Sequence, residues 1–405
     1  MNPHVCGDCF RDESIKQFVY DNAVSDQCDF CGRRKDSPVA APWNAVLAFI
    51  REGLEFYWTT DVDDLPIEPF DDEGRRMIHS YDTEQLLKGD GMIADDTPVL
   101  APIANEAVLQ ALEQSMPDDW YDRYMTEEEP YGKLILQWPD FVYRVERKSR
   151  FFFFTPMKGD SETFEPAQFP TVRLLDELGD LVRKTNLVKI VPARARFFRA
   201  RQHRLEVPVE TASELGPPAH SVAFSSNRMS PAGIVMFYGA YDGQTAKREV
   251  CDQGRASVER ETELTIGQFE TLADIKAIDL TELPPCPSIF DRDNRIMISG
   301  IRFLHRFVEN LKRSVRKDGK EHLEYVPTQV ITEYFRHGFA DTEQSAVQGI
   351  LYPSSIEKAG ICCVLFFEAD QCGGEPLNPF NSQRRQQWLR LKTDSVEHSK
   401  VEKLI

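Results

Sequence analysis

The chain has 405 residues, of which 41% are hydrophobic and 28% charged, and a formal net charge of −18 at pH 7. This length exceeds one ordinary domain, so about two or three domains with apolar cores are expected. No apolar run approaches the roughly 18 residues that cross a bilayer, and the N-terminal residues lack the basic and apolar regions of a secretory signal. The nine cysteines form no disulfide framework, so we expect a cytoplasmic protein without membrane association.

Two CxxC pairs dominate residues 1–35. The four sulfur ligands that they offer belong to Cys6, Cys9, Cys28 and Cys31. Four thiolates in two pairs, 18 residues apart, are typical of a tetrahedral structural Zn²⁺ site, which has no open position for a substrate. Gly7 and Gly32 lie in or beside the pairs, where a positive φ is often needed. The sequence therefore predicts a four-cysteine zinc knuckle, and the alternative is two redox-active or adventitious pairs.

Residues 36–170 are predicted to form an acidic, mainly helical domain. Apolar residues at helical spacing predict helices over 42–58 and 103–115. Residues 51–130 hold 22 Asp and Glu against five basic residues, so −17 of the net charge lies there. Such a surface repels nucleic-acid backbones, and no nucleic-acid partner is expected. A solvated acidic face is favoured over a docking site for a basic partner. Residues 155–170, with three prolines and a glycine, are predicted to be a linker.

From residue 171 on, the pattern changes to short β-rich runs between helical stretches. Helices are predicted over 171–188 and 301–314. The β-rich runs are residues 194–201, 221–226, 233–241, 256–265 and 361–368. This alternation favours an α+β domain over residues 171–375. The polar residues 376–405 are expected to form a helix or a loose C-terminal tail.

Several polar residues of this half could form an anion site. Walker A, GxGxxG, HExxH and GxSxG motifs are absent from the sequence. The candidates are Arg199, Arg228, Tyr238, Glu249 and Ser354. Two arginines can hold a phosphate or pyrophosphate, a tyrosine can stack on a pyridine ring, and a carboxylate can stabilise an oxocarbenium-like transition state. Each residue taken singly also has a structural explanation, so these residues alone leave only a weak anion-site hypothesis.

The order of the motifs in this half resembles that of the RES domain family. The matching stretches are FRAR (198–201), the Gly216–Pro218 turn, NRMSPAGIVMFYGA (227–240), TAKREV (245–250), DLTELPPCPSIFD (279–291), EYVPTQVITEYFR (324–336) and GILYPSS (349–355). The resemblance covers about residues 175–370. It implies a fold like that of ADP-ribosyltransferases and an enzyme that degrades NAD⁺ by phosphorolysis or hydrolysis. Many family members are toxins of toxin–antitoxin pairs, and some ADP-ribosylate a protein.

The resemblance also implies a role for each candidate residue. Arg199 and Arg228 match the two family arginines and are expected on the phosphates of NAD⁺. Tyr238 is expected beside the nicotinamide or its ribose, and Glu249 on the ribose and its developing cation. The serine that positions the ligand matches Ser354, with Ser355 as the neighbouring alternative. Arg199, Tyr238, Glu249 and Ser354 are thus the expected catalytic group. In one departure from the family, Ser230 stands where an asparagine is frequent.

The N-terminal half resembles the domain called HEPN/RES N-terminal. HEPN ribonucleases carry Arg-x₄₋₆-His, but the only histidine of residues 36–170, His79, follows Arg75 and Arg76 at the wrong spacing. No ribonuclease activity is therefore expected, and the domain is expected to regulate or sense. A fragment without residues 1–170 should then keep the activity of the RES domain.

The predicted function is that of an NAD⁺ phosphorylase or NAD⁺ glycohydrolase, with inorganic phosphate as a co-substrate in the first case. Two alternatives stay open: a protein ADP-ribosyltransferase, and an inactive zinc-containing interaction module. The retained candidate residues argue against the inactive module. An antitoxin or regulatory protein is an expected partner, and a homodimer is the expected assembly.

Overall fold

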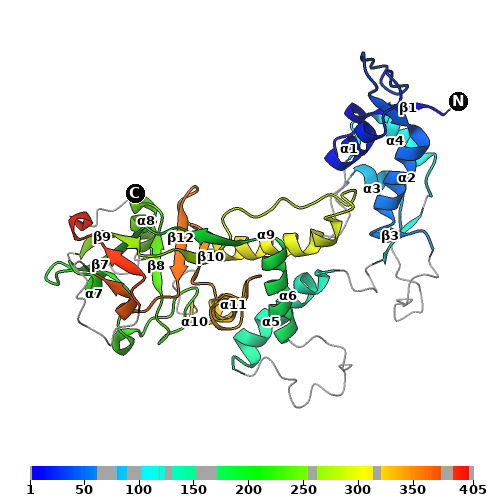
Figure 1. Ribbon diagram of the computed structural model, residues 1–405. Helices are drawn as coiled ribbons and strands as arrows, with labels where there is room; N and C mark the ends of the chain where they lie inside the picture. The colour runs from blue at the N-terminus through cyan, green and yellow to red at the C-terminus, as the bar shows by residue number, and fades with distance from the viewer. Residues whose placement is uncertain are drawn as a thin grey trace. The chain divides into compact units, whose positions relative to one another are not determined.

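The computed structural model describes residues 2–61, 80–88, 102–117, 119–123, 130–151, 171–253, 262–312, 321–374 and 386–400. Within these ranges the chain mixes helices and sheets and forms two compact units (Figure 1). Unit 1 comprises Met1–Lys133 and Pro285–Arg302, and unit 2 comprises Leu134–Pro284 and Phe303–Ile405. None of the helices in the described ranges combines the length and apolarity needed to cross a bilayer. The linker predicted over 155–170 lies outside the described residues.

Unit 1 packs short helices against two small sheets. Its helices include α1 (Glu13–Asp21), α2 (Trp43–Leu54), α3 (Thr83–Lys88) and α4 (Glu106–Glu113). Its strands pair as β1 (His4–Cys6) with β2 (Ala40–Pro42), and as β3 (Trp58–Thr59) and β4 (Ser80–Tyr81) on either side of β5 (Trp120–Asp122). The helices predicted over 42–58 and 103–115 are confirmed as α2 and α4, though each is shorter than predicted. The side chain of Asn105 accepts hydrogen bonds from the amides of Ala107 and Val108, which fixes the start of α4.

A segment distant in sequence, Pro285–Arg302, completes the core of unit 1. Its apolar side chains Ile289, Phe290 and Ile298 are each at most 2% exposed. Phe290 packs on α2 at Gly53, where a Cβ atom would lie 2.2 Å from its ring. Arg292 of the same segment forms an ion pair with Glu52 and lies 4.9 Å from the ring centre of Phe49. The segment is therefore part of the N-terminal unit, although the chain enters it from β10 and leaves it through α9.

Unit 2 is built around one sheet. Within the described ranges it has ten strands in the order β13-β14-β9-β7-β8-β12-β11-β10-β6, and β15 pairs with β9 beside β14. The strands are β6 (Val188–Val191), β7 (Arg196–Arg204), β8 (Phe237–Ala240), β9 (Thr262–Thr271), β10 (Ile275–Asp279), β11 (Gly349–Pro353), β12 (Ile361–Leu365), β13 (Cys372–Gly373), β14 (Leu389–Leu391) and β15 (Glu397–Lys400). The fully buried side chains of Phe197, Phe237 and Phe269 form part of a core on this sheet.

Two helices of unit 2 precede β6 in the chain, and the others lie between strands. These helices are α5 (Gly132–Tyr143), which begins in unit 1 and continues as a π-helix through Lys148, α6 (Thr171–Lys184), α7 (Ala212–Leu215), α8 (Gly243–Gln253), α9 (Ile298–Lys312), α10 (Glu321–Glu324) and α11 (Val326–His337). The helices predicted over 171–188 and 301–314 are confirmed as α6 and α9. The mixed α+β character predicted for this half is also confirmed.

Two predictions for unit 2 are wrong. The run 221–226 is not a strand, because His220–Val222 form a 3₁₀ turn and Phe224 is 80% exposed. Among the described C-terminal residues, 386–400, the prediction of a helix or a loose tail is wrong. Leu389 and Leu391 are fully buried as alternate residues of β14, and β15 pairs with β9. Two buried leucines at strand spacing anchor a segment that its polar composition had marked as unstructured.

Candidate functional site

A cavity of about 790 Å³ opens in unit 2 beside β7, β8 and α8. This volume lies in the range of roughly 300–1,000 Å³ that is usual for ligand pockets. Charged and hydroxyl side chains converge on it, namely Arg199, Arg201, Arg228, Glu249, Tyr238, Tyr325, Tyr352, Ser225, Ser226, Ser230 and Ser355. Of the described residues that line it, three are arginines and one is a carboxylate. The cavity is thus suited to a ligand that carries more than one negative charge.

Arg199 extends from β7 and is half-buried at the cavity. Its Nε donates to the carbonyl of Leu215 at 2.7 Å, and its Nη1 donates to the carbonyl of Tyr238 at 2.8 Å. Burial lowers the pKa of this guanidinium to about 10, so it still carries its charge at neutral pH. No carboxylate pairs with it among the described residues. A partly buried cation that is held by two carbonyls and the ring of Phe237, all of them neutral, favours the binding of an anion.

Arg228 lies in a turn that is fastened to α11. The side chain of Gln329 donates to the carbonyl of Asn227 at 2.7 Å, and Thr328 donates to the carbonyl of Arg228. The guanidinium of Arg228 lies 5.9 Å from the ring centre of Tyr325. These contacts explain how a loop residue reaches a defined place at the cavity.

Tyr238 points from β8 to the same turn. Its hydroxyl donates to Ser230 Oγ at 2.8 Å. Burial raises the pKa of this phenol above its ordinary value, so it stays a hydrogen-bond donor. Ser230, the residue that departs from the family pattern, is therefore the acceptor that orients Tyr238.

Glu249 lies on α8, which begins directly after β8. The carboxylate of Asp242 accepts from the amide of Thr245 at 2.8 Å and so caps this helix. Ser354 Oγ donates to Glu249 Oε1 at 2.5 Å, and the thiol of Cys362 lies 3.6 Å from the same oxygen. The carboxylate is held by two neighbours while it lines the cavity.

Ser354 and Ser355 have different surroundings. Ser354 is 7% exposed, and its Oγ accepts from the amides of Ile356 and Glu357 at 3.1 and 3.0 Å while it donates to Glu249. Ser355 is the one that lines the cavity. The structure thus brings Arg199, Arg228, Tyr238 and Glu249 to one cavity, with Ser354 behind the carboxylate.

The sequence analysis missed two aromatic residues of this site. Tyr325 and Tyr352 both line the cavity. Burial raises the pKa of Tyr352 well above its ordinary value, which keeps its hydroxyl protonated. A signal was present, because each lies inside a stretch that matches the RES family.

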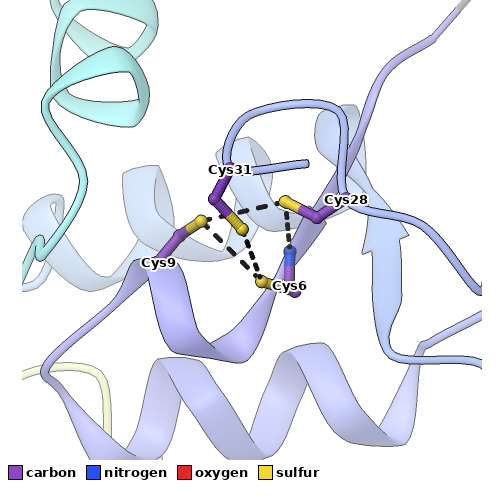
Figure 2. A group of neighbouring side chains, drawn as sticks. All are labelled: Cys6, Cys9, Cys28 and Cys31. Carbon is purple, nitrogen blue, oxygen red and sulfur yellow. Dashed lines mark hydrogen bonds between the residues drawn. The ribbon is translucent and has the colours of Figure 1, made fainter. Parts of the chain in front are cut away.

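Four cysteines of unit 1 form a second candidate site (Figure 2). Their sulfurs point toward one another, with Cys6 Sγ 3.8 Å from Cys9 Sγ and 3.5 Å from Cys31 Sγ, and Cys9 Sγ 3.8 Å from Cys28 Sγ. A disulfide would bring two sulfurs to about 2.05 Å. Four thiolates at about 2.3 Å from one ion lie about 3.8 Å apart. The group can therefore hold a metal ion.

The two glycines of the knuckle differ in what they contribute. Gly32, directly after Cys31, has φ +72°, as predicted for the turn of a knuckle. Gly7 has no positive φ, but a Cβ atom there would lie 2.8 Å from the ring of Tyr20. The position of Gly7 therefore favours glycine because the ring of Tyr20 leaves no room for a side chain.

Comparisons with known families agree with this arrangement. The pattern of HEPN/RES N-terminal domain 1 matches residues 21–159, and that of the RES domain matches residues 196–388. No curated protein and no solved structure matches the chain. The RES match contains every residue that lines the cavity. The chain therefore contains a RES domain, preceded by a HEPN/RES N-terminal domain.

Proposed function

We propose that unit 2 binds NAD⁺ in this cavity and cleaves the bond between nicotinamide and ribose. One observation supports this proposal above the others. Among the described residues that line the cavity, Glu249 is the single carboxylate, and three arginines line the same cavity. RES domains are associated with NAD-processing enzymes, and NAD⁺ carries a pyrophosphate together with a ribose that becomes cationic on cleavage. An ADP-ribosyltransferase-like fold is part of this proposal.

The arginines would bind the pyrophosphate. Arg199 is the stronger anchor, because it is half-buried and its hydrogen bonds within the described chain go to carbonyls. Arg228 reaches the cavity from its turn, and Tyr325 beside it offers a ring on which a base can stack. Tyr238, oriented by Ser230, would lie beside the nicotinamide or its ribose.

Glu249 would act on the reacting carbon. When the C1″–N bond breaks, its electron pair leaves with the nicotinamide, which becomes neutral, and positive charge develops on the ribose. A carboxylate near this carbon stabilises the transition state more than the ground state. An oxygen of phosphate or water then forms the new bond to C1″. The products are nicotinamide and ADP-ribose 1″-phosphate, or nicotinamide and ADP-ribose.

Ser354 is a positioning residue in this scheme. It lies behind Glu249, and its own hydroxyl is fixed by two backbone amides. The hydrogen bond from Ser354 fixes the orientation of the Glu249 carboxylate. A carboxylate that is already oriented needs no reorganisation during the reaction. Ser355 is placed to contact the ligand itself.

For the cysteine site we propose structural Zn²⁺, since four thiolates in tetrahedral spacing prefer this ion and leave no position for a substrate. The site lies in unit 1 and takes no part in the proposed reaction. An antitoxin partner, a homodimer and a cytoplasmic location stay predictions from the sequence.

The test is to incubate the purified full-length protein with NAD⁺, with and without inorganic phosphate, and to identify the products by mass. Nicotinamide release that depends on Glu249 supports cleavage, and an ADP-ribose phosphate identifies the acceptor. A matched control is Glu206→Gln, which changes an exposed glutamate away from the cavity. ADP-ribose attached to protein would favour the transferase alternative, and no NAD⁺ turnover would favour the inactive module.

A further inference from the structure

Two histidines and a glutamate come together on the sheet of unit 2, outside the cavity. His203 lies on β7, Glu263 on the neighbouring β9, and His398 on β15. His203 is directly opposite Glu263, and His398 is directly opposite Thr265. Because paired residues of adjacent strands share a face, and residues two apart along a strand do too, all four side chains lie on one face.

The three ionisable groups are close enough to bind one ion. Their nearest ligand atoms all lie within 4.8 Å of one another. Glu263 Oε2 is 4.0 Å from His203 Nε2 and 3.8 Å from His398 Nδ1. Nitrogen and oxygen ligands about 2.0–2.1 Å from a tetrahedral ion lie roughly 3.4 Å apart. The two distances to Glu263 would shorten by about half an ångström, and the two imidazole nitrogens, which lie within 4.8 Å of each other, would approach to the same separation.

The tautomer of His203 is set for metal binding. Its Nδ1 lies 3.0 Å from the carbonyl oxygen of Arg204, which can only accept a hydrogen bond. With the proton on Nδ1, Nε2 of the neutral ring has the lone pair, and this lone pair accepts a hydrogen bond from Thr265 Oγ1 at 2.7 Å, which a bound ion would displace. A metal-binding histidine typically donates its other N–H to a carbonyl in this way. The side chain of His203 is 5% exposed, so this orientation is held by its surroundings.

Thr265 lies between the two imidazoles. Its Oγ1 is 2.7 Å from His203 Nε2 and 2.8 Å from His398 Nδ1. Lys400 is opposite Glu263 in the strand register, yet among the described residues the ion-pair partners of Glu263 are the two imidazoles. The carboxylate of Glu263 is thus paired with the two histidines, and the hydroxyl of Thr265 lies beside them as a fourth group with a ligand atom.

We propose that His203, Glu263 and His398 bind one divalent transition-metal ion, with Thr265 as its neighbouring hydroxyl. Two imidazoles and one carboxylate suit Zn²⁺ first. The ion would join β15, near the C-terminus, to β9 and β7. Since Arg199 stands four residues before His203 on β7, the same ion would steady the strand that carries the half-buried arginine of the cavity. This site is independent of the four cysteines of unit 1 and of the proposed reaction.

The experiment measures metal content and metal surroundings in tag-free full-length protein. The protein is loaded with Zn²⁺, dialysed against metal-free buffer, and analysed by mass spectrometry for metal and by X-ray absorption for ligand distances. We expect two ions per chain and two shells, one at about 2.3 Å from sulfur and one at about 2.0–2.1 Å from nitrogen and oxygen. His398→Gln and Glu263→Gln should each reduce the content to one ion and remove the nitrogen and oxygen shell.

Two controls keep the result interpretable. His305→Gln changes an exposed histidine whose ring hydrogen-bonds the carbonyl of Pro284, and it should keep both ions. Circular dichroism checks that each variant is folded, and His398 is 35% exposed, so its replacement is compatible with folding. One ion per chain with sulfur ligands alone in the wild type would overturn the proposal. The finding of an adventitious ion only would also overturn it. Such an ion would be lost on dialysis, or it would be retained by all three variants.

Discussion

Replacing Glu249 by glutamine tests the proposed chemistry most directly. Glutamine has the size of glutamate and keeps an oxygen that can accept the hydrogen bond which Ser354 donates at 2.5 Å. Ser354 itself stays fixed by the amides of Ile356 and Glu357. The substitution therefore removes the negative charge and little else from the cavity.

The expected loss follows from the charge that develops in the reaction. Removal of one preorganised electrostatic group typically reduces turnover by about 10²- to 10³-fold, or about 2.7–4 kcal/mol of transition-state stabilisation. The loss should be in kcat, because Glu249 would act on the cation that exists only as nicotinamide departs. Binding of NAD⁺ should be close to that of the wild type, since the arginines are unchanged.

The assay is the initial rate of nicotinamide release at several NAD⁺ concentrations, with binding measured separately by calorimetry. Glu206→Gln serves as the control for a lost surface charge. Wild-type turnover in a folded Glu249→Gln protein would refute both the role of this carboxylate and the mechanism built on it. A loss of binding with unchanged kcat would assign Glu249 to ligand recognition.

Three further predictions concern other parts of the chain. Arg199→Ala should weaken NAD⁺ binding as well as turnover, because it removes a half-buried charge; calorimetry that finds unchanged affinity would contradict this. Replacing Cys6 and Cys28 by serine should abolish the metal bound at the four cysteines and unfold the N-terminal unit, as metal content and circular dichroism would reveal; retention of the sulfur-bound ion would exclude the site. Gly53→Ala should lower the melting temperature, because the new Cβ would lie 2.2 Å from the ring of Phe290. Overpacking costs about 1–3 kcal/mol, which outweighs the roughly 1 kcal/mol that alanine gains over glycine in a helix. An unchanged melting temperature would show that the ring can move aside.

Periodicity in the sequence was sufficient to predict four of the described helices. The amphipathic patterns of α2, α4, α6 and α9 are local, so each can be recognised within a few turns. Their ends were less well predicted, as α2 stops at Leu54. The run 221–226 has apolar residues typical of a strand, but Val222 and Phe224 are exposed. A strand forms only where a distant segment pairs with it, and the local sequence pattern does not indicate whether such a partner strand is present.

The candidate site was predictable in its residue types but not in its contacts. The family motifs pointed to Arg199, Arg228, Tyr238 and Glu249, which do line one cavity. The difference between Ser354 and Ser355 depends on which way a turn presents each hydroxyl, and adjacent residues of one type cannot be separated by pattern alone. The group of His203, Glu263 and His398 is similarly invisible in the sequence, since its members lie 60 to 195 residues apart on three strands.

The packing of Pro285–Arg302 in unit 1 has a consequence for where this protein can be cut. The segment falls within the RES match, so a boundary drawn from homology assigns it to the catalytic part. A fragment beginning at residue 171 would contain Ile289, Phe290 and Ile298 without the side chains that cover them. Exposing each of these apolar side chains to water would cost about 1.5–3 kcal/mol of folding free energy. We therefore revise the expectation that a fragment without residues 1–170 keeps its activity. Such a fragment should be prone to aggregate. Because the segment is continuous with β10 at one end and with α9 at the other, hybrids that exchange only one half between relatives should lose folding cooperativity, whereas exchange of the segment together with its N-terminal partner should preserve it.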